Sequence, residues 1–142
     1  MKSMMMRSVA LMMVTAATAS LSLMSTASAQ TDPYGRWLAE DIFSGGVIDR
    51  LQTTLDLAPD GRATGFGGCN SFTGRANITG QNVSFGPLAS TRKACTPAVM
   101  DQEQKFHKAV EAATAWRIEQ TKLVLTNASG DVVAKLTRLD SL

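Results

Sequence analysis

The chain has 142 residues and a formal net charge of +2, from 14 lysines and arginines against 12 acidic residues. Two of those cations, Lys2 and Arg7, fall in an amino-terminal stretch that we expect to be removed, which leaves 12 charges of each sign. Binding a polyanion through a broad basic face needs a surplus of positive charge, so nucleic acid is not expected as a partner.

The first 29 residues have the pattern of a cleavable signal peptide. A short basic start leads into an apolar stretch over 9–19, and small residues end in Ala-Ser-Ala at 27–29. A membrane-spanning helix needs about 20 largely apolar residues, whereas this stretch is shorter and is interrupted by threonine and serine. We therefore predict an exported, soluble chain over 30–142 without a transmembrane segment. The periplasm is its expected location, with outer-membrane association or secretion as alternatives.

Short strands separated by turns are predicted for the first part of the remaining chain. A strand is expected over 34–40, with Trp37 as a core anchor, and alternating apolar residues predict another over 52–58. Asp60 and Gly61 indicate a hairpin turn, because such turns need residues that tolerate positive φ. Further short strands are expected over 62–67, 75–79, 83–85 and 88–91.

One helix is predicted over 97–114. Thr96 is a suitable N-cap, and Pro97 fits the first helical position, where a missing N–H costs nothing. Apolar residues recur at helical spacing to form one stripe, at Val99, Phe106, Val110 and Ala113. The opposite face is polar and is expected to face solvent, with Asp101 and Lys105 four residues apart in the favourable order.

Three final strands are expected over 115–119, 122–126 and 132–139. The length supports one hydrophobic core but not two, and no repeat divides the chain. The predicted fold class is therefore α+β, a single domain in which a curved antiparallel sheet of several short strands packs on one main helix.

Cys69 and Cys95 are the two cysteines of the chain. An even number in an exported chain favours a structural disulfide, which would stabilise the fold by about 3 kcal/mol. Free thiols and a redox pair are the alternatives, although the spacing differs from Cys-x-x-Cys. The single histidine, His107, is far from both in sequence and is expected at the surface. No metal site, cofactor, nucleophilic triad or catalytic residue is expected.

Several short motifs together carry a family resemblance. They are Trp-Leu at 37–38, GFGGCN at 65–70, ASTRKAC at 89–95, and Glu103 with Phe106 on the helix that follows. This pattern resembles the META domain, the family that includes the heat-shock protein HslJ. The resemblance extends over nearly all of the chain after the leader.

The resemblance implies a protein of the cell envelope with no defining catalytic activity. Family members are linked to the heat-shock response and to novobiocin tolerance in bacteria. We therefore expect a non-enzymatic module that binds an unknown envelope protein or a small ligand. The alternatives are an interaction or inhibitor module directed at another periplasmic protein, and a small thiol redox protein that uses Cys69 or Cys95.

Three glycines in the first cysteine motif have two interpretations. Gly65, Gly67 and Gly68 are predicted to serve tight turns and close backbone packing; Gly68 also makes this run richer in glycine than the family pattern requires. The alternative is a cradle of backbone N–H groups for an anion. The run lacks the Lys-Ser or Lys-Thr ending of a nucleotide-binding loop.

The second cysteine motif contains candidate polar contacts. Ser90, Thr91 and Arg92 offer two hydroxyls and a guanidinium that suit a carboxylate or phosphate. We favour a buried network instead, in which the hydroxyls bond backbone groups and Arg92 pairs with Glu103. Asn70, in the first motif, belongs to the same candidate network.

Overall fold

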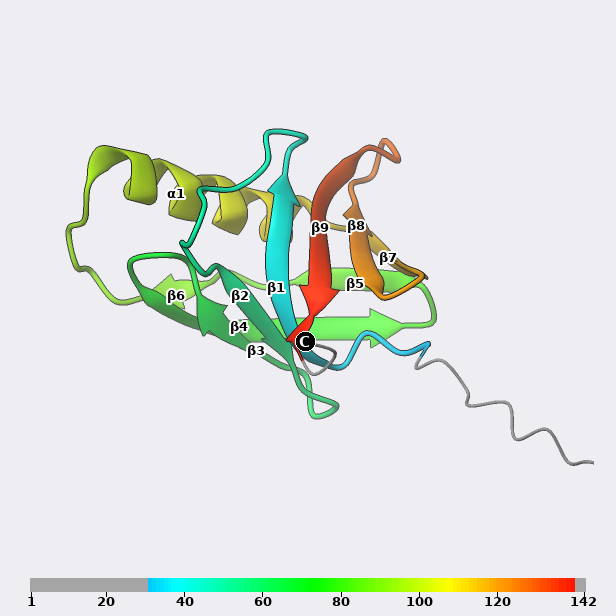
Figure 1. The fold of residues 1–142 in the computed structure, drawn as a ribbon. Coiled ribbons are helices and arrows are strands. Elements are labelled where there is room, and N and C mark those ends of the chain that lie inside the picture. The colour runs from blue at the N-terminus through cyan, green and yellow to red at the C-terminus, as the bar shows by residue number, and fades with distance from the viewer. Residues whose placement is uncertain (1–30, 140–142) are drawn as a thin grey trace, which may run out of the picture.

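The computed structural model describes residues 31–139, and the predicted leader over 1–29 lies outside that range. The described strands are β1 (Gly35–Ile42), β2 (Thr54–Leu57), β3 (Arg62–Phe66), β4 (Ser71–Thr79), β5 (Asn82–Phe85), β6 (Ala89–Ser90), β7 (Ala115–Glu119), β8 (Lys122–Thr126) and β9 (Val132–Arg138). Helix α1 spans Pro97–Ala112. The predicted α+β class, with antiparallel strands and one helix in a single domain, is confirmed (Figure 1).

The sheet curves until it closes on itself. Its strand order is β3-β2-β1-β9-β8-β7-β5-β4-β6, and β4 also pairs with β3. The β3–β4 pairing aligns Phe66 with Ser71 at the point where the chain turns back. The β5–β7 pairing is narrow, with a single register pair between Asn82 and Ala115. The closed sheet is therefore joined extensively between β3 and β4 but only narrowly between β5 and β7.

Helix α1 covers the inside of this curved sheet. Figure 1 shows it passing behind β1 in the upper part of the view. Its Phe106 and Val110 are fully buried, together with Trp37 and Leu55 from the sheet. The Phe106 ring lies 5.9 Å from the ring of Phe72 on β4. The predicted apolar stripe is thus the face that packs on the sheet, because burial of such side chains is the main favourable term in folding.

Helix α1 begins at Pro97 as predicted, but its N-cap and its C-terminal end differ from the prediction. Thr96 has the extended backbone of an N-cap, but its side chain makes no capping hydrogen bond. The helix ends at Ala112 rather than 114, because the N–H of Thr114 bonds the carbonyl of Thr126 in the sheet. Within residues 31–139, α1 is not long and apolar enough to cross a membrane, and no other helix is described there.

Strand β4 begins at Ser71, four residues before the predicted start. The predicted strand over 75–79 begins directly after Gly74, and glycine weakens a strand pattern. In the structure Gly74 allows a close approach, since a Cβ there would lie 2.8 Å from the Leu88 side chain. Residues 71–74 pair with β3, and this pairing extends the strand.

Candidate functional site

The turn between β3 and β4 holds a carboxylate from the helix. The backbone N–H groups of Cys69 and Asn70 donate to Oε2 of Glu103, at 2.9 and 2.6 Å. The side-chain amide of Asn70 donates to the other oxygen, Oε1, at 2.8 Å. Glu103 is only 4% exposed. The glycine-rich motif therefore forms a backbone cradle for an anion, and the anion is a side chain of the same chain.

These contacts determine the charge of Glu103. Burial raises the pKa of Glu103, but hydrogen bonds from Asn70 and Cys69, together with nearby His107, outweigh it and hold that pKa below its usual range. The carboxylate is therefore ionised at neutral pH. Both of its oxygens already accept hydrogen bonds.

The three glycines of the motif make room for this arrangement. A Cβ at Gly67 would lie 2.6 Å from Cγ of Glu103, so only glycine lets that side chain reach the turn. Gly68 has φ +126°, a conformation that other residues rarely adopt. A Cβ at Gly65 would lie 2.1 Å from the carbonyl oxygen of Thr54.

Asn70 also fastens the segment that follows β6. Its Oδ1 accepts hydrogen bonds from the Thr91 hydroxyl at 2.9 Å and from the N–H of Lys93 at 2.6 Å. Its amide donates to the carbonyl of Lys93 at 3.1 Å. Two residues further on, Cys95 is joined to Cys69 by the predicted disulfide. The segment is therefore tied to the first motif by hydrogen bonds and by a covalent bond.

The predicted pairing of Arg92 with Glu103 is wrong. The Glu103 oxygens are occupied by the turn, and Arg92 is exposed and forms no ion pair with any described residue. Thr91 does enter the network, but through the side chain of Asn70 rather than a backbone group. Ser90 is exposed at the end of β6.

Sequence reasoning missed a second buried amide beside Glu103. Gln102 accepts from the N–H of Ile48 at 2.7 Å and donates to the Thr53 hydroxyl at 3.0 Å. That hydroxyl donates in turn to the carbonyl of Gly67 at 2.9 Å. The available signal was the position of Gln102 and Glu103, two polar residues adjoining the apolar stripe of an amphipathic helix.

A cavity of about 380 Å³ lies between the fastened segment and the helix. Its walls are residues 90–94, Asn70, and four residues of α1, namely Met100, Glu103, Gln104 and His107. We refer to this cavity as the Arg92 groove. It brings the candidate residues Asn70, Ser90, Thr91, Arg92 and Glu103 to one place, and the three motif glycines lie outside its lining.

His107 is half-buried in this groove, although a surface position was predicted. Its ring lies edge-on to Phe72, with ring centres 5.3 Å apart. Its Nε2 is buried and has no hydrogen-bond partner among the described residues. The prediction failed because the strand that carries Phe72 packs beside this part of the helix, a contact between segments far apart in sequence.

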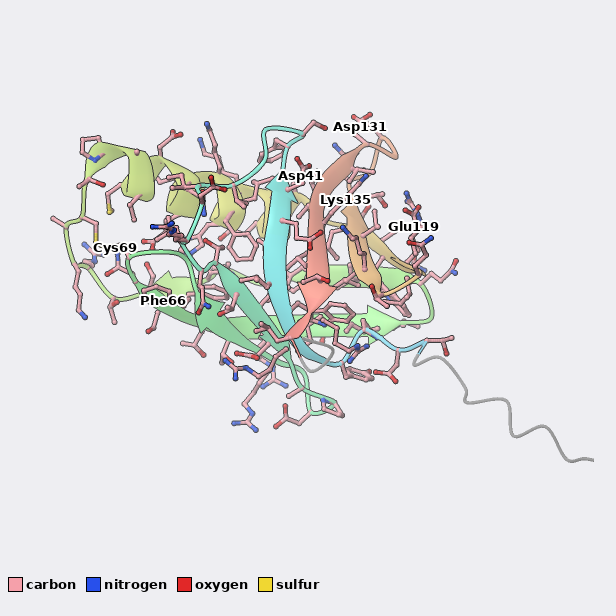
Figure 2. All side chains as sticks on the ribbon, viewed as in Figure 1. Asp41, Phe66, Cys69, Glu119, Asp131 and Lys135 are labelled. Atoms are coloured by element: carbon pink, nitrogen blue, oxygen red, sulfur yellow. A yellow bond between two sulfur atoms is a disulfide. The ribbon has the colours of Figure 1, made fainter. Side chains whose placement is uncertain are left out.

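A second exposed feature is the loop between β1 and β2. Phe43 is 45% exposed and Ile48 38% exposed. The Asp41 carboxylate holds the start of this loop by accepting the N–H of Ser44 at 3.0 Å. Figure 2 shows Asp41 well away from Cys69, so the start of the loop lies apart from the cysteine motifs, whereas the hydroxyl of Thr53 at its end bonds the carbonyl of Gly67.

A closed antiparallel sheet packed on one helix, with a disulfide beside the helix, defines the architectural class of this protein. The META domain model matches residues 29–139, and the chain belongs to the META domain family. The predicted family resemblance is confirmed.

Solved structures show the same fold. One NMR structure of a protein is 17% identical, with 77% of this chain and 92% of that chain covered and a TM-score of 0.60. An NMR structure of a protein from Burkholderia xenovorans is 22% identical, with 73% and 81% covered and a TM-score of 0.59. No curated protein matches the sequence.

Proposed function

We propose that this chain is an exported, non-enzymatic protein of the cell envelope that binds a small ligand in the Arg92 groove. The observation that carries the proposal is that the loop on one side of the groove is held rigidly while a polar atom on the helix side has no partner. The walls are fixed by the disulfide and by Asn70, whereas His107 Nε2 lacks a partner among the described residues. Small-molecule sites are concave, largely pre-formed and lined by a few such polar groups.

Export is supported by the leader pattern over 1–29 and by the bridge between Cys69 and Cys95, since disulfides persist in oxidising compartments. The test is the intact mass of the protein recovered from the periplasm, before and after reduction and alkylation. We expect a mass that begins at Gln30 and two thiols that react only after reduction. A recovered mass that retains the leader would contradict cleavage.

The absence of catalysis is supported by how the reactive groups of the groove are used. Both oxygens of Glu103 accept hydrogen bonds, and both cysteines are in the bridge. His107 Nε2 has no hydrogen-bond partner among the described residues, so this nitrogen makes no nucleophile–base contact of the kind that covalent catalysis needs. Groove-dependent turnover of any bound compound would contradict this part of the proposal.

Ligand binding is tested by saturation-transfer NMR against a panel of small carboxylates, amines, amides and sugars. Ala94→Trp places a large side chain in the groove, and Ala112→Trp makes the same change at an exposed helix position outside it. We expect at least one compound class to bind wild-type and Ala112→Trp but not Ala94→Trp. A panel that binds none of the three proteins, or all three equally, would contradict the proposal.

The link to stress tolerance rests on the family resemblance. We propose that ligand binding in the groove supports survival of heat or novobiocin. The test compares a bacterial strain that lacks its own copy after complementation with wild-type, Ala94→Trp or Ala112→Trp protein. We expect Ala94→Trp alone to fail to restore survival at equal protein levels. Equal rescue by all three would separate the groove from stress tolerance.

A protein-interaction module is the second candidate, favoured by the exposed side chains of Phe43 and Ile48 on a loop that hydrogen bonds hold in place. Exposed apolar side chains on a rigid loop are common anchors for a partner protein. Pull-down from periplasmic extract with wild-type and Phe43→Ser protein tests it. The expected result is a partner lost with Phe43→Ser but retained with Ala94→Trp.

A further inference from the structure

The charges around the Arg92 groove favour a negatively charged ligand. Arg92 and Lys93 are adjacent, exposed and line the groove, and neither forms an ion pair with a residue of the described chain. Among the other exposed cations of the described chain, Arg36 pairs with Asp56, whereas Arg50 has no ion pair either. What distinguishes Arg92 and Lys93 is that they lie together in a groove. The guanidinium group matches a carboxylate in a two-pronged geometry that lysine alone does not offer.

A second, independent observation is the unsatisfied nitrogen of His107. Among residues 31–139, its Nε2 is the buried side-chain polar atom without a hydrogen-bond partner. Leaving such an atom unpaired costs free energy, which a ligand recovers when it supplies a partner. The amide of Gln104 also lines the groove and is exposed. The groove therefore offers the exposed amide of Gln104 from the helix as well as charge from the loop, and His107 Nε2 becomes available when its ring turns toward the groove.

The loop that carries the two cations is already ordered before any ligand arrives. The residue before Arg92 is held by the bond from the Thr91 hydroxyl to Asn70, and Lys93 is held through its own N–H and carbonyl. A pre-organised loop lowers the entropy cost of binding. The side chains of Met100 and Ala94 supply an apolar wall beside these cations.

Glu103 limits how much negative charge the groove accepts. Its carboxylate lines the same groove, and hydrogen bonds from Asn70 and Cys69 keep its pKa below the usual range despite burial. Two cations beside one fixed carboxylate leave a local charge of one positive when the His107 ring is neutral. A single negative charge matches this balance, whereas a phosphate dianion is repelled more strongly by Glu103.

We propose that the Arg92 groove binds a small monocarboxylate, with its carboxylate on Arg92 and Lys93 and its apolar body against Met100. His107 lies at the helix side of the groove, and its Nε2, which is buried in the ligand-free chain, bonds a polar atom of the ligand after the ring turns toward it. This inference rests on the proposed ligand-binding function and specifies its ligand class. A volume of about 380 Å³ suits a compound of the size of an aromatic or short-chain acid.

The test uses matched probes that differ in charge but not in shape. Benzoate is compared with benzamide, and hexanoate with hexanamide, by NMR titration of the oxidised protein over 30–142. We expect each carboxylate to bind at least tenfold more tightly than its amide. Phenyl phosphate, tested at a pH where it is a dianion, is expected to bind more weakly than benzoate.

Matched substitutions locate the binding. We expect Arg92→Gln to weaken benzoate binding at least tenfold and to leave benzamide binding unchanged. Arg50→Gln removes an exposed arginine outside the groove and is expected to have no effect. His107→Phe keeps an aromatic ring beside Phe72 but removes Nε2, and is expected to weaken binding of a hydroxylated benzoate. Thermal unfolding of each variant shows whether the fold is intact.

The outcomes separate this inference from the proposed function. Amides that bind as tightly as the carboxylates, with binding blocked by Ala94→Trp, would overturn the monocarboxylate while leaving the groove as a ligand site. Carboxylate binding that Arg92→Gln and Arg50→Gln weaken equally would indicate general surface charge and also overturn the inference. If none of the probes and none of the wider compound panel binds, both statements fail.

Discussion

Two regions of the molecule contain an arginine, and the two side chains are used in different ways. Arg138, at the end of β9, is 9% exposed and donates to the carbonyls of Tyr34 at 2.7 Å and Asp32 at 3.0 Å. Its guanidinium also lies 4.3 Å from the ring centre of Trp37. The two hydrogen bonds and the cation–π contact of Arg138 thus join the end of β9 to the segment that leads into β1.

Arg92 stands in the opposite situation. It is exposed on a loop that other residues hold, and it has no ion pair within the described residues. The same groove contains His107 Nε2, which also lacks a partner there. The difference teaches that a polar side chain whose hydrogen bonds are satisfied within the chain has a structural role. An unsatisfied polar side chain on a rigid part of the fold is a candidate for ligand binding.

The largest expected effect comes from the frame of the groove. Glu103→Ala removes three hydrogen bonds and leaves the buried N–H groups of Cys69 and Asn70 without an acceptor. We expect the free energy of unfolding to fall by about 4 kcal/mol, measured by urea denaturation. Gln104→Ala, one residue along on the exposed side, should change it by less than about 0.5 kcal/mol. Similar stability for both variants would contradict the structural role of Glu103.

The disulfide is the next largest contribution. Replacing Cys69 and Cys95 together by alanine opens a loop with a sequence separation of 26 and is expected to lower the free energy of unfolding by about 3 kcal/mol. Reductant should destabilise the wild-type protein by a similar amount and leave the double variant unaffected. A double variant as stable as the oxidised protein would show that the hydrogen bonds of Asn70 alone fix the loop.

The two arginines provide the direct test of the comparison. Arg138→Met is expected to lower the free energy of unfolding by about 2 kcal/mol, because the bonds to Tyr34 and Asp32 are lost from a buried site. Arg92→Met should change it by less than about 0.5 kcal/mol. Differential scanning calorimetry of the two variants measures both. Equal losses would remove the distinction between the structural arginine and the available one.

Acid should weaken the frame of the groove. Because the pKa of Glu103 is lower in the folded chain than its ordinary value of 4.5, the stability it contributes is complete above that value and is lost as pH falls through the folded pKa. Asp60 also has a lowered pKa, from the N–H of Arg62, so the wild-type curve does not isolate one group. We therefore expect the stability gap between wild-type and Glu103→Gln to narrow from pH 7 to pH 3. A constant gap would contradict the assignment.

The fold could be predicted from local patterns, but its closure could not. Alternation around Leu55 and Leu57 indicated a strand, and the apolar stripe through Phe106 indicated the helix. The pairing of β3 with β4 and the narrow contact between Asn82 and Ala115 depend on segments meeting in space. Periodicity describes one segment at a time and carries no information on such pairing.

The candidate site was predicted in its membership and not in its contacts. The family motifs drew attention to Asn70, Thr91 and Glu103, which do lie together. Opposite charge favours a pair between Arg92 and Glu103, but in the structure backbone N–H groups donate to that carboxylate instead. Every residue except proline has a backbone N–H, so a sequence indicates a backbone donor only through the glycines that allow its close approach. Whether His107 Nε2 has a hydrogen-bond partner depends on segments that are distant in sequence.

The smallest expected change in stability concerns the loop after β1. There a hydrogen bond from a backbone N–H to a carboxylate holds a residue in an unfavourable backbone conformation. Ser44 has φ +58°, and its N–H donates to Asp41. Asparagine adopts such left-handed conformations more readily than serine, so Ser44→Asn is expected to raise the free energy of unfolding by about 0.5 kcal/mol. Ser84→Asn, at an exposed position of β5, should give no gain and serves as the control. If urea denaturation shows the same change for both variants, the bond to Asp41 already offsets the backbone strain. Ser44 would then resemble Arg138, because its hydrogen bond serves to hold the structure in place.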